Sequence, residues 1–355
     1  MTKKLFVLNI AAPYRVEFLN QLAEKEDILV IFENISDKNR DEKWLANDKI
    51  KFKHYFIDKK ISNLIRALID LLIHKQIIIG GYATPISASF ILFLKLLRKP
   101  FILNADGGFV KQEKWIIKKL KTFMISSASY WLSTGEKTNE YLQYYGANKL
   151  NIYEYPFSSV KNNDIKLIDE SHKKRLKSEL NFKYKTNILY VGSFTSRKNV
   201  EILINAASKI SNIGFHFVGG HPSEDYLKIS NASENIYYYP HLSKEEVFKY
   251  YDASDLFIFP TLEDIWGLVI NEAVSRGLPI ITTNKCIAGL ELLTSEELGI
   301  IIPADISPEL LKEVIIETLN NYNKFNKEKI LQKAKEYSIE NMVESHIELL
   351  NQIYK

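Results

Sequence analysis

The sequence predicts an α/β protein of two domains, each built on a parallel β-sheet, that face one another across a cleft. Short apolar runs alternate with longer amphipathic runs, which is the pattern of strand–helix–strand units. The alternation stops in a polar stretch, Val160–Tyr184, and then starts again. The length of 355 residues also fits about two domains.

The first series of elements spans residues 1–160, which we expect to form the first domain. Strands are expected at the short apolar runs Lys4–Asn9, Ile28–Phe32, Gln76–Ile79, Phe101–Asn104 and Ser129–Leu132. Helices are expected where apolar residues recur every three or four positions, at Tyr14–Lys25, Ser62–His74, Pro85–Leu97, Glu113–Ser126 and Glu136–Tyr145.

The second series follows residues 161–184, which are rich in Lys, Asp and Asn and predict a linker with an exposed helix. Residues 185–335 are expected to form the second domain. Its strands are expected at Asn187–Val191, Gly214–Val218, Ile236–Tyr239, Leu256–Phe259 and Pro279–Thr282. Its helices are expected at Val200–Ser211, Lys244–Ala253, Leu268–Arg276 and Pro308–Asn321. Residues 336–355 predict a final helix, Ile339–Tyr354, that packs back on the first domain.

Composition restricts the classes of function. The net charge of +4 argues against a nucleic-acid binder. Cys286 is the sole cysteine, which rules out an internal disulfide and a cysteine-based metal cage, and we expect no metal site. The apolar runs Ile61–Ile73 and Ile86–Leu97 are shorter than the roughly 18 to 20 residues of a membrane-spanning helix. We therefore expect a cytoplasmic protein.

Two acids follow the strand Leu256–Phe259. Pro260 ends this strand because it cannot donate to a central ladder. Glu263 and Asp264 then lie in a loop at the carboxyl end of a strand, where open α/β sheets bind ligands. Gly277 is expected as the left-handed cap that ends the next helix. For Glu263 alone, compensation of the helix dipole is an equally good explanation.

The helix that follows this loop offers groups for a nucleotide. Gly267, Leu268 and Val269 form its first turn, whose free N–H groups suit an anion. Glu272 lies about one and a half turns further along, and a carboxylate there accepts hydrogen bonds from the two hydroxyls of a ribose.

Two further strand ends carry glycines and cations. Gly192 follows Asn187–Val191, and Arg197 and Lys198 come just before the next helix. Cations at that place do not offset the helix dipole, whereas they can bind a diphosphate. Solvated surface charge is the alternative. Gly219 ends Gly214–Val218 and permits close approach of the backbone.

The first domain offers weaker candidates. Arg15 lies where the first strand gives way to a helix, so it can contact phosphate or be an ordinary surface arginine. Asp106 precedes two glycines at another strand end, and it can bind a hydroxyl or form an Asp-Gly turn. Four lysines recur at helical spacing within residues 111–121 beside apolar residues. This amphipathic pattern suits an anionic membrane surface or a solvated helix face.

The motifs of the second half, taken in order, resemble the donor domain of the retaining glycosyltransferases of family 4, which have the GT-B fold of two Rossmann-like domains. They cover about the last half of the chain. The matching segments are Val191-Gly192, Lys198-Asn199, Val218–Pro222, Pro260–Ala273 and Gly277–Pro279. Parts of the first half, including Pro13–Phe18, Phe32-Glu33, Arg40–Trp44 and Tyr144–Phe157, are similar to bacterial enzymes that build surface polysaccharides.

The resemblance implies roles for single residues. Glu272 would bind the donor ribose, Asp264 would lie near the transferred sugar, and Lys198 would bind the diphosphate. Leu268 and Val269 would offer backbone N–H groups to the phosphates. The family usually has Glu where this chain has Asp264, with Glu263 adjacent. It also has an arginine where this chain has Ser193, so Arg197 is the expected substitute.

The resemblance implies transfer of a sugar, with retention and without a metal or other cofactor, from a UDP- or GDP-linked donor. The implied acceptor is a glycan or lipid-linked hydroxyl, such as a polyprenyl-diphosphate-linked glycan in capsule, O-antigen or exopolysaccharide synthesis. Peripheral contact with an anionic membrane, at the inner face of the cell membrane, would follow. The alternatives are a non-catalytic sugar-nucleotide-binding subunit, another GT-B enzyme such as an epimerase, and a peripheral membrane scaffold.

Overall fold

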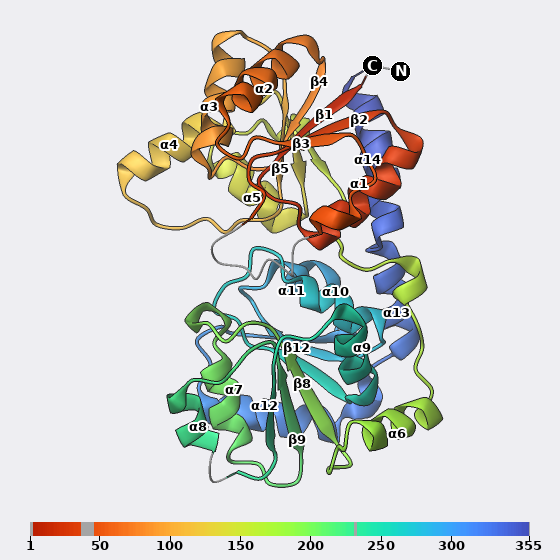
Figure 1. The fold of residues 1–355 in the computed structure, drawn as a ribbon. Coiled ribbons are helices and arrows are strands. Elements are labelled where there is room, and N and C mark those ends of the chain that lie inside the picture. Colours follow the sequence, from red (N-terminus) through yellow and green to blue (C-terminus); the bar gives the residue numbers. More distant parts are fainter. Residues whose placement is uncertain (1–2, 37–45, 231–232, 355) are drawn as a thin grey trace. The chain divides into compact units, whose positions relative to one another are not determined.

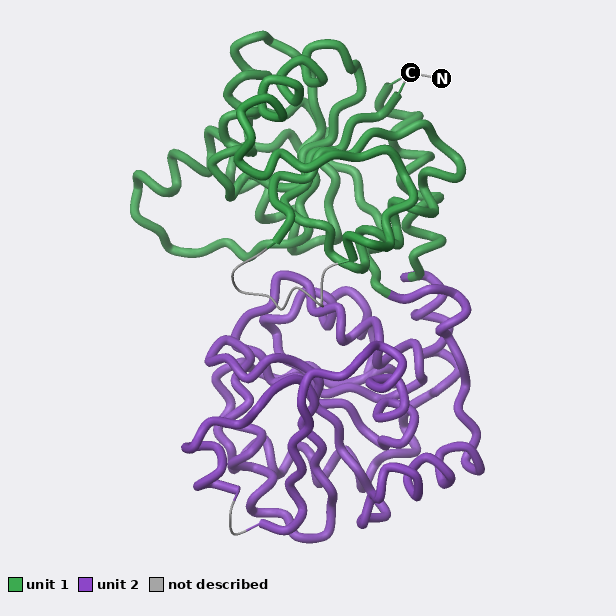
Figure 2. The backbone as a smooth tube through the Cα atoms, in the orientation of Figure 1, with its two compact units in different colours: residues 1–159, 338–355 green, residues 160–337 purple. Residues whose placement is uncertain are grey.

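The computed structural model describes residues 3–36, 46–230 and 233–354. These residues form two compact units, shown in different colours in Figure 2. Unit 1 comprises residues 1–159 and 338–355, and unit 2 comprises residues 160–337. The segment Arg40–Trp44, which carries part of the family resemblance, lies outside the described residues.

Unit 1 is built on a parallel sheet of seven strands in the order β3-β2-β1-β4-β5-β6-β7 (Figure 1). The inner strands are buried on both faces, which explains their continuous apolar sequences. The strands are β1 (Lys4–Leu8), β2 (Ile28–Phe32), β3 (His54–Phe56), β4 (Gln76–Ile79), β5 (Ile102–Ala105), β6 (Tyr130–Ser133) and β7 (Ile152–Glu154).

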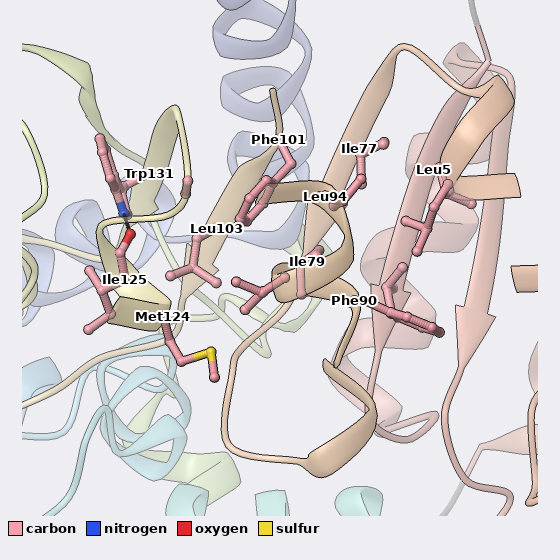
Figure 3. Packing of buried hydrophobic residues seen from close by; sticks show 14 of the residues in the cluster. Leu5, Ile77, Ile79, Phe90, Leu94, Phe101, Leu103, Met124, Ile125 and Trp131 are labelled. Carbon is pink, nitrogen blue, oxygen red and sulfur yellow. Dashed lines mark hydrogen bonds between the residues drawn. The ribbon is translucent and has the colours of Figure 1, made fainter. Parts of the chain in front are cut away.

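Helices cover both faces of this sheet. The helices are α1 (Pro13–Lys25), α2 (Ile61–Ile73), α3 (Pro85–Leu96), α4 (Trp115–Ile125), α5 (Glu136–Tyr144) and α14 (Ile339–Ile353). The helices α2 to α5 share one apolar core with the sheet, and Figure 3 shows part of it. In that core the indole N–H of Trp131 donates to the carbonyl of Ile125 at 2.9 Å, so its polar edge is satisfied.

The helix α14 closes the chain by returning to unit 1, where it packs on α1. The rings of Phe18 and His346 lie 4.6 Å apart, and Lys25 forms an ion pair with Glu344. Near the end of α14, the Tyr354 hydroxyl accepts a hydrogen bond from the backbone N–H of Ile77 at 3.2 Å. Unit 1 is therefore assembled from two separate stretches of sequence.

Unit 2 is built on a parallel sheet of six strands in the order β10-β9-β8-β11-β12-β13. The strands are β8 (Asn187–Val191), β9 (Gly214–Val218), β10 (Ile236–Tyr239), β11 (Leu256–Phe259), β12 (Ile280–Thr283) and β13 (Gly299–Ile302). The helices are α6 (Glu170–Glu179), α7 (Val200–Ala207), α8 (Glu224–Ser230), α9 (Lys244–Ala253), α10 (Leu268–Ser275), α11 (Ile287–Leu292), α12 (Pro308–Asn320) and α13 (Lys327–Glu336).

The structure contains strands and helices that the sequence pattern did not predict. The missed strands β3, β7 and β13 all lie at sheet edges and have three or four residues. The strands β3 and β7 have three residues each and are only partly buried, so they lack a continuous apolar run. The strand β13 is a short apolar run, Gly299–Ile302, that the expected elements did not include. The missed helices are α8, α11 and α13. The helix expected at Val200–Ser211 ends at Ala207, and α6 buries Leu176 and Lys173, so one of its faces is not exposed.

Candidate functional site

Two cationic side chains follow the first strand of the unit 2 sheet. The strand β8 leads into one turn of 3-10 helix, η5 (Ser196–Lys198), which carries Arg197 and Lys198. The Arg197 carbonyl accepts hydrogen bonds from the N–H of Leu262 at 2.9 Å and the hydroxyl of Thr261 at 3.0 Å. These bonds join η5 to the loop after β11. The cations Arg197 and Lys198 therefore lie beside the loop that carries Glu263 and Asp264.

The cations of η5 meet the acid of the neighbouring loop. The Lys198 ammonium forms a close ion pair with the carboxylate of Asp264, and it lies 4.6 Å from the centre of the Phe259 ring. The Arg197 guanidinium lies 3.7 Å from the same carboxylate and donates to the Glu263 carbonyl at 2.6 Å. The Lys198 and Asp264 side chains are only 13% and 12% exposed, whereas that of Arg197 is 52% exposed.

The backbone holds Asp264 in place from both sides. Its N–H donates to the Lys285 carbonyl at 2.7 Å, and its carbonyl accepts from Ile287 at 3.2 Å. The N–H of Trp266 donates to a carboxylate oxygen of Asp264 at 3.4 Å. Because Lys285 and Ile287 lie between the end of β12 and the first residue of α11, the acid has a fixed position at the carboxyl end of the sheet.

The helix α10 begins directly after this loop. Gly267 precedes it with a φ of +100°, and a Cβ at this position would lie 2.7 Å from the sulfur of Cys286. Only glycine fits such a place. No side chain of the described residues caps α10, so the first turn with Leu268 and Val269 keeps the positive end of the helix dipole available to an anion.

Glu272 lies further along α10, and its environment is unusual for a carboxylate. The Tyr251 hydroxyl, from α9, donates to its carboxylate at 3.1 Å. Burial raises the pKa of Glu272 to about 7, against the opposing influence of the Lys244 charge and of the Tyr251 hydrogen bond. A ligand that donates hydrogen bonds to this carboxylate would therefore stabilise its ionised form.

The two strand-end glycines lie against each other. A Cβ on Gly219, whose φ is +125°, would lie 2.6 Å from the Gly192 carbonyl oxygen. The N–H of Gly192 donates to the carbonyl of Val218 at 2.9 Å. The ends of β8 and β9 can approach this closely only because Gly219 carries no side chain.

Unit 1 holds the two remaining candidates. Arg15, near the start of α1, forms an ion pair with Asp106, which follows β5. The amide of Asn104 donates to the other Asp106 oxygen at 3.3 Å, and Arg15 donates to the Tyr14 hydroxyl at 3.0 Å. Burial lowers the pKa of Arg15, but the charge of Asp106, together with the interactions with Tyr14 and Tyr155, more than reverses this, so the pKa lies above its ordinary value.

The structure thus gathers the expected residues into two groups, one in each unit. In unit 2, Arg197, Lys198, Glu263 and Asp264 lie beside the start of α10. In unit 1, Arg15 pairs with Asp106. Sequence reasoning missed the Tyr251 contact with Glu272. A tyrosine 21 positions away gives no signal in a local pattern.

A family model matches most of the second unit. Residues 172–339 match the family model of Glycosyl transferases group 1. Solved structures agree in fold across the chain. The structure of HepE from Anabaena in complex with UDP and glucose has a TM-score of 0.78 at 13% identity and covers 99% of this chain and 100% of that chain. The structure of WaaG, a glycosyltransferase involved in lipopolysaccharide biosynthesis, has a TM-score of 0.68 at 13% identity and covers 98% and 99%.

Curated relatives match over shorter segments. An uncharacterized 41.2 kDa protein in the cps region of Klebsiella pneumoniae is 28% identical over 40% of this chain and 39% of its own length. Lipopolysaccharide glucosyltransferase WaaG of Escherichia coli (strain K12) is 27% identical over 37% of each chain. The matches therefore span less than half of these relatives. The chain has the GT-B fold of two Rossmann-like units, and within it residues 172–339 are similar to Glycosyl transferases group 1.

Proposed function

We propose that the chain transfers a sugar, with retention, from a nucleoside-diphosphate sugar to an acceptor hydroxyl. The observation that carries this proposal is the Lys198–Asp264 ion pair beside the uncapped start of α10. It combines a cation, an acid and free N–H groups at the carboxyl end of a parallel sheet, where α/β proteins bind nucleotides. The family match and the UDP bound in the HepE structure support the same donor class.

The donor is held by groups from three places in unit 2. Lys198, with Arg197 in the role of the arginine that Ser193 replaces, binds the diphosphate. The backbone N–H groups of Leu268 and Val269 bind the same phosphates. Glu272 accepts hydrogen bonds from the ribose hydroxyls, and the close glycines Gly192 and Gly219 leave room for the donor beside the backbone.

The chemistry depends on stabilising the leaving group. The bond between the anomeric carbon and the diphosphate oxygen breaks, and the acceptor oxygen bonds to that carbon on the same face. The acceptor proton passes to the nucleoside diphosphate. Lys198 and the α10 N–H groups stabilise the negative charge that develops on the diphosphate, so no metal is needed for this role. Asp264 lies near the transferred sugar once Lys198 turns to the phosphates.

The acceptor is proposed to bind unit 1, where Arg15 and Asp106 offer a cation and a hydrogen-bond acceptor. We infer a lipid-linked glycan, such as one carried on polyprenyl diphosphate, for the synthesis of a surface polysaccharide. The similarity to a protein of a cps region and to WaaG supports this class. The proposed place of the reaction is the cytoplasmic face of the cell membrane.

Donor binding is tested by thermal unfolding with UDP, GDP and their sugars. A nucleotide present at 100 times its dissociation constant stabilises the folded state by about 2.7 kcal/mol. We expect one nucleotide class to raise the melting temperature. If neither class does so, the donor site is wrong.

Catalysis is tested by Lys198→Ala, which removes the charge that stabilises the leaving diphosphate. We expect donor hydrolysis or transfer to fall by about 10²-fold or more. The matched control is Lys209→Ala, which also removes a lysine from an ion pair of unit 2 and is expected to leave the rate unchanged. Nucleotide binding with no turnover by the wild-type protein would favour a non-catalytic subunit. Conversion of one donor sugar into another without an acceptor would favour an epimerase.

A further inference from the structure

Unit 1 exposes an unusual amount of apolar surface on three consecutive helices. Among the described residues, 12 of the 22 exposed large hydrophobic side chains lie on α2, α3 and α4 or at their ends. The set is named the α2–α4 surface and comprises Ile61, Ile65, Ile69, Leu72, Ile73, Leu92, Leu96, Leu97, Trp115, Ile116, Ile117 and Leu120. Exposed apolar residues that gather in this way mark a surface that contacts a partner.

These residues form one surface because the three helices are neighbours. The helices α2, α3 and α4 follow one another along one side of unit 1 (Figure 1), and their inner faces pack on the same core. Lys99, just after α3, donates to the carbonyl of Leu72 at the end of α2. Lys95 of α3 lies with its ammonium 4.1 Å from the centre of the Phe123 ring of α4. The outer faces of the helices therefore adjoin.

The charge around this surface has a single sign. No acidic residue in segments 59–75, 92–99 and 111–121 is exposed. The two acids there, Asp70 and Glu113, have side chains only 13% and 12% exposed. Asp70 accepts from the Tyr55 hydroxyl, and Glu113 pairs with Lys121. The exposed charges of these segments are Lys59, Lys60, Arg66, Lys75, Lys95, Arg98, Lys111, Lys114, Lys118 and Lys119.

Charge decides which occupant fits. A second copy that docked through the same surface would bring ten cations against ten, which is unfavourable. An anionic bilayer attracts the cations and accepts the apolar side chains between its headgroups. Trp115 is 65% exposed, with the Lys119 ammonium 4.7 Å from its ring centre, as suits an interfacial aromatic residue. None of the described helices is long and apolar enough to cross a membrane, so the contact is peripheral.

We propose that unit 1 docks on an anionic lipid bilayer through the α2–α4 surface, with the apolar side chains in the interface and the cations among the headgroups. This surface does not overlap the donor site of unit 2. The docking therefore stands whether or not the proposed sugar transfer is correct.

Vesicle flotation of the whole chain without nucleotide tests the docking. We expect binding to phosphatidylcholine vesicles with 30% phosphatidylglycerol to exceed binding to pure phosphatidylcholine by at least about tenfold, and to weaken at high salt. The double variant Lys114→Gln/Lys119→Gln should bind the anionic vesicles about fivefold more weakly for each charge removed. The double variant Trp115→Ser/Leu120→Ser should also bind more weakly.

The matched control is Leu310→Ser/Ile316→Ser, which removes two exposed apolar side chains from α12 of unit 2. It should bind like the wild-type protein. Circular dichroism and the melting temperature of each variant show that it is folded. Equal binding to both vesicle types, or full binding by the α4 variants, would overturn the proposal. The proposal would also be overturned if the wild-type protein bound no lipid and sedimented as a dimer, and the α4 variants sedimented as monomers. A nucleotide-induced rise in melting temperature is measured separately and is not affected by these variants.

Discussion

Glu272 shows how one residue links the stability of unit 2 to its proposed ligand. Burial raises its pKa from the ordinary 4.5 to about 7. The folded protein therefore holds a proton between these two pH values that the unfolded chain releases. Stability falls as pH rises through this window, because the folded state must then carry a buried charge. Ribose hydroxyls would offset that cost by donating to the ionised carboxylate.

The variant Glu272→Gln removes this charge and keeps a hydrogen-bond acceptor for Tyr251. We expect the variant to gain stability relative to the wild-type protein as pH rises from 4.5 to 8, by about 2 to 3 kcal/mol. At the same time it should bind the nucleotide more weakly. Denaturant unfolding at several pH values gives the first quantity, and calorimetry gives the second.

The control for this variant is Glu201→Gln, which removes an exposed carboxylate from α7 in the same unit. It should change neither the pH dependence of stability nor the affinity for nucleotide. If Glu272→Gln showed the stability gain but bound nucleotide as well as the wild-type protein, the carboxylate would have no role toward the ribose.

The sequence could place single site residues but not their partners. Asp264 and Lys198 each follow a predicted strand, so their position at the carboxyl edge could be inferred from local pattern. Their ion pair joins residues 66 positions apart and depends on β8 lying beside β11. The periodicity of apolar residues along the sequence does not reveal that these two strands are neighbours. The same holds for Cys286, whose sulfur lies where a side chain on residue 267 would point.

At the scale of elements, the ends of β8 and β9 are kept together by glycine. We predict that Gly219→Ala destabilises the protein by about 2 to 4 kcal/mol, because it combines a strained positive φ with a Cβ 2.6 Å from the Gly192 carbonyl. The affinity for nucleotide should fall as well, since the displaced loop leads into η5. Thermal unfolding and nucleotide titration measure both effects.

The neighbouring Gly220 supplies the control. Its φ is not positive, and the nearest atom to an added Cβ would be 3.8 Å away, in Phe194. Gly220→Ala should therefore change stability by less than about 0.5 kcal/mol. Equal losses in the two variants would show that the close approach of the strand ends does not matter.

Strands could be predicted where all of their residues are buried, because such strands consist of apolar residues. The inner strands are buried throughout, and their apolar runs could be recognised. The strands β3 and β7 contain exposed residues. They form only because their backbone groups pair with the neighbouring strands β2 and β6. Short helices such as α11 are likewise fixed by tertiary contacts and not by their own periodicity.

At the scale of the whole molecule, unit 2 is one continuous stretch, residues 160–337, whereas unit 1 needs two stretches. We predict that residues 160–337, produced alone, unfold cooperatively and retain the nucleotide-induced rise in melting temperature. The reason is that every proposed donor-binding residue, from Gly192 to Glu272, lies within this stretch.

Calorimetry of this fragment with the nucleotide that binds the whole chain is the measurement. Its control is the fragment with Lys198→Ala, which should fold but bind more weakly. A fragment that folds yet fails to bind would mean that donor binding also depends on residues of unit 1.

The return of α14 to unit 1 has a consequence during synthesis. A ribosome releases residues 1–159 first, while the helix that covers α1 is still to be translated. At 5 to 20 residues per second, the intervening 178 residues of unit 2 take roughly 10 to 40 seconds. Throughout this interval Phe18 lacks its contact with His346. The second unit can therefore finish folding before the first, and a nascent chain halted at residue 337 would carry a finished second unit on an unfinished first one.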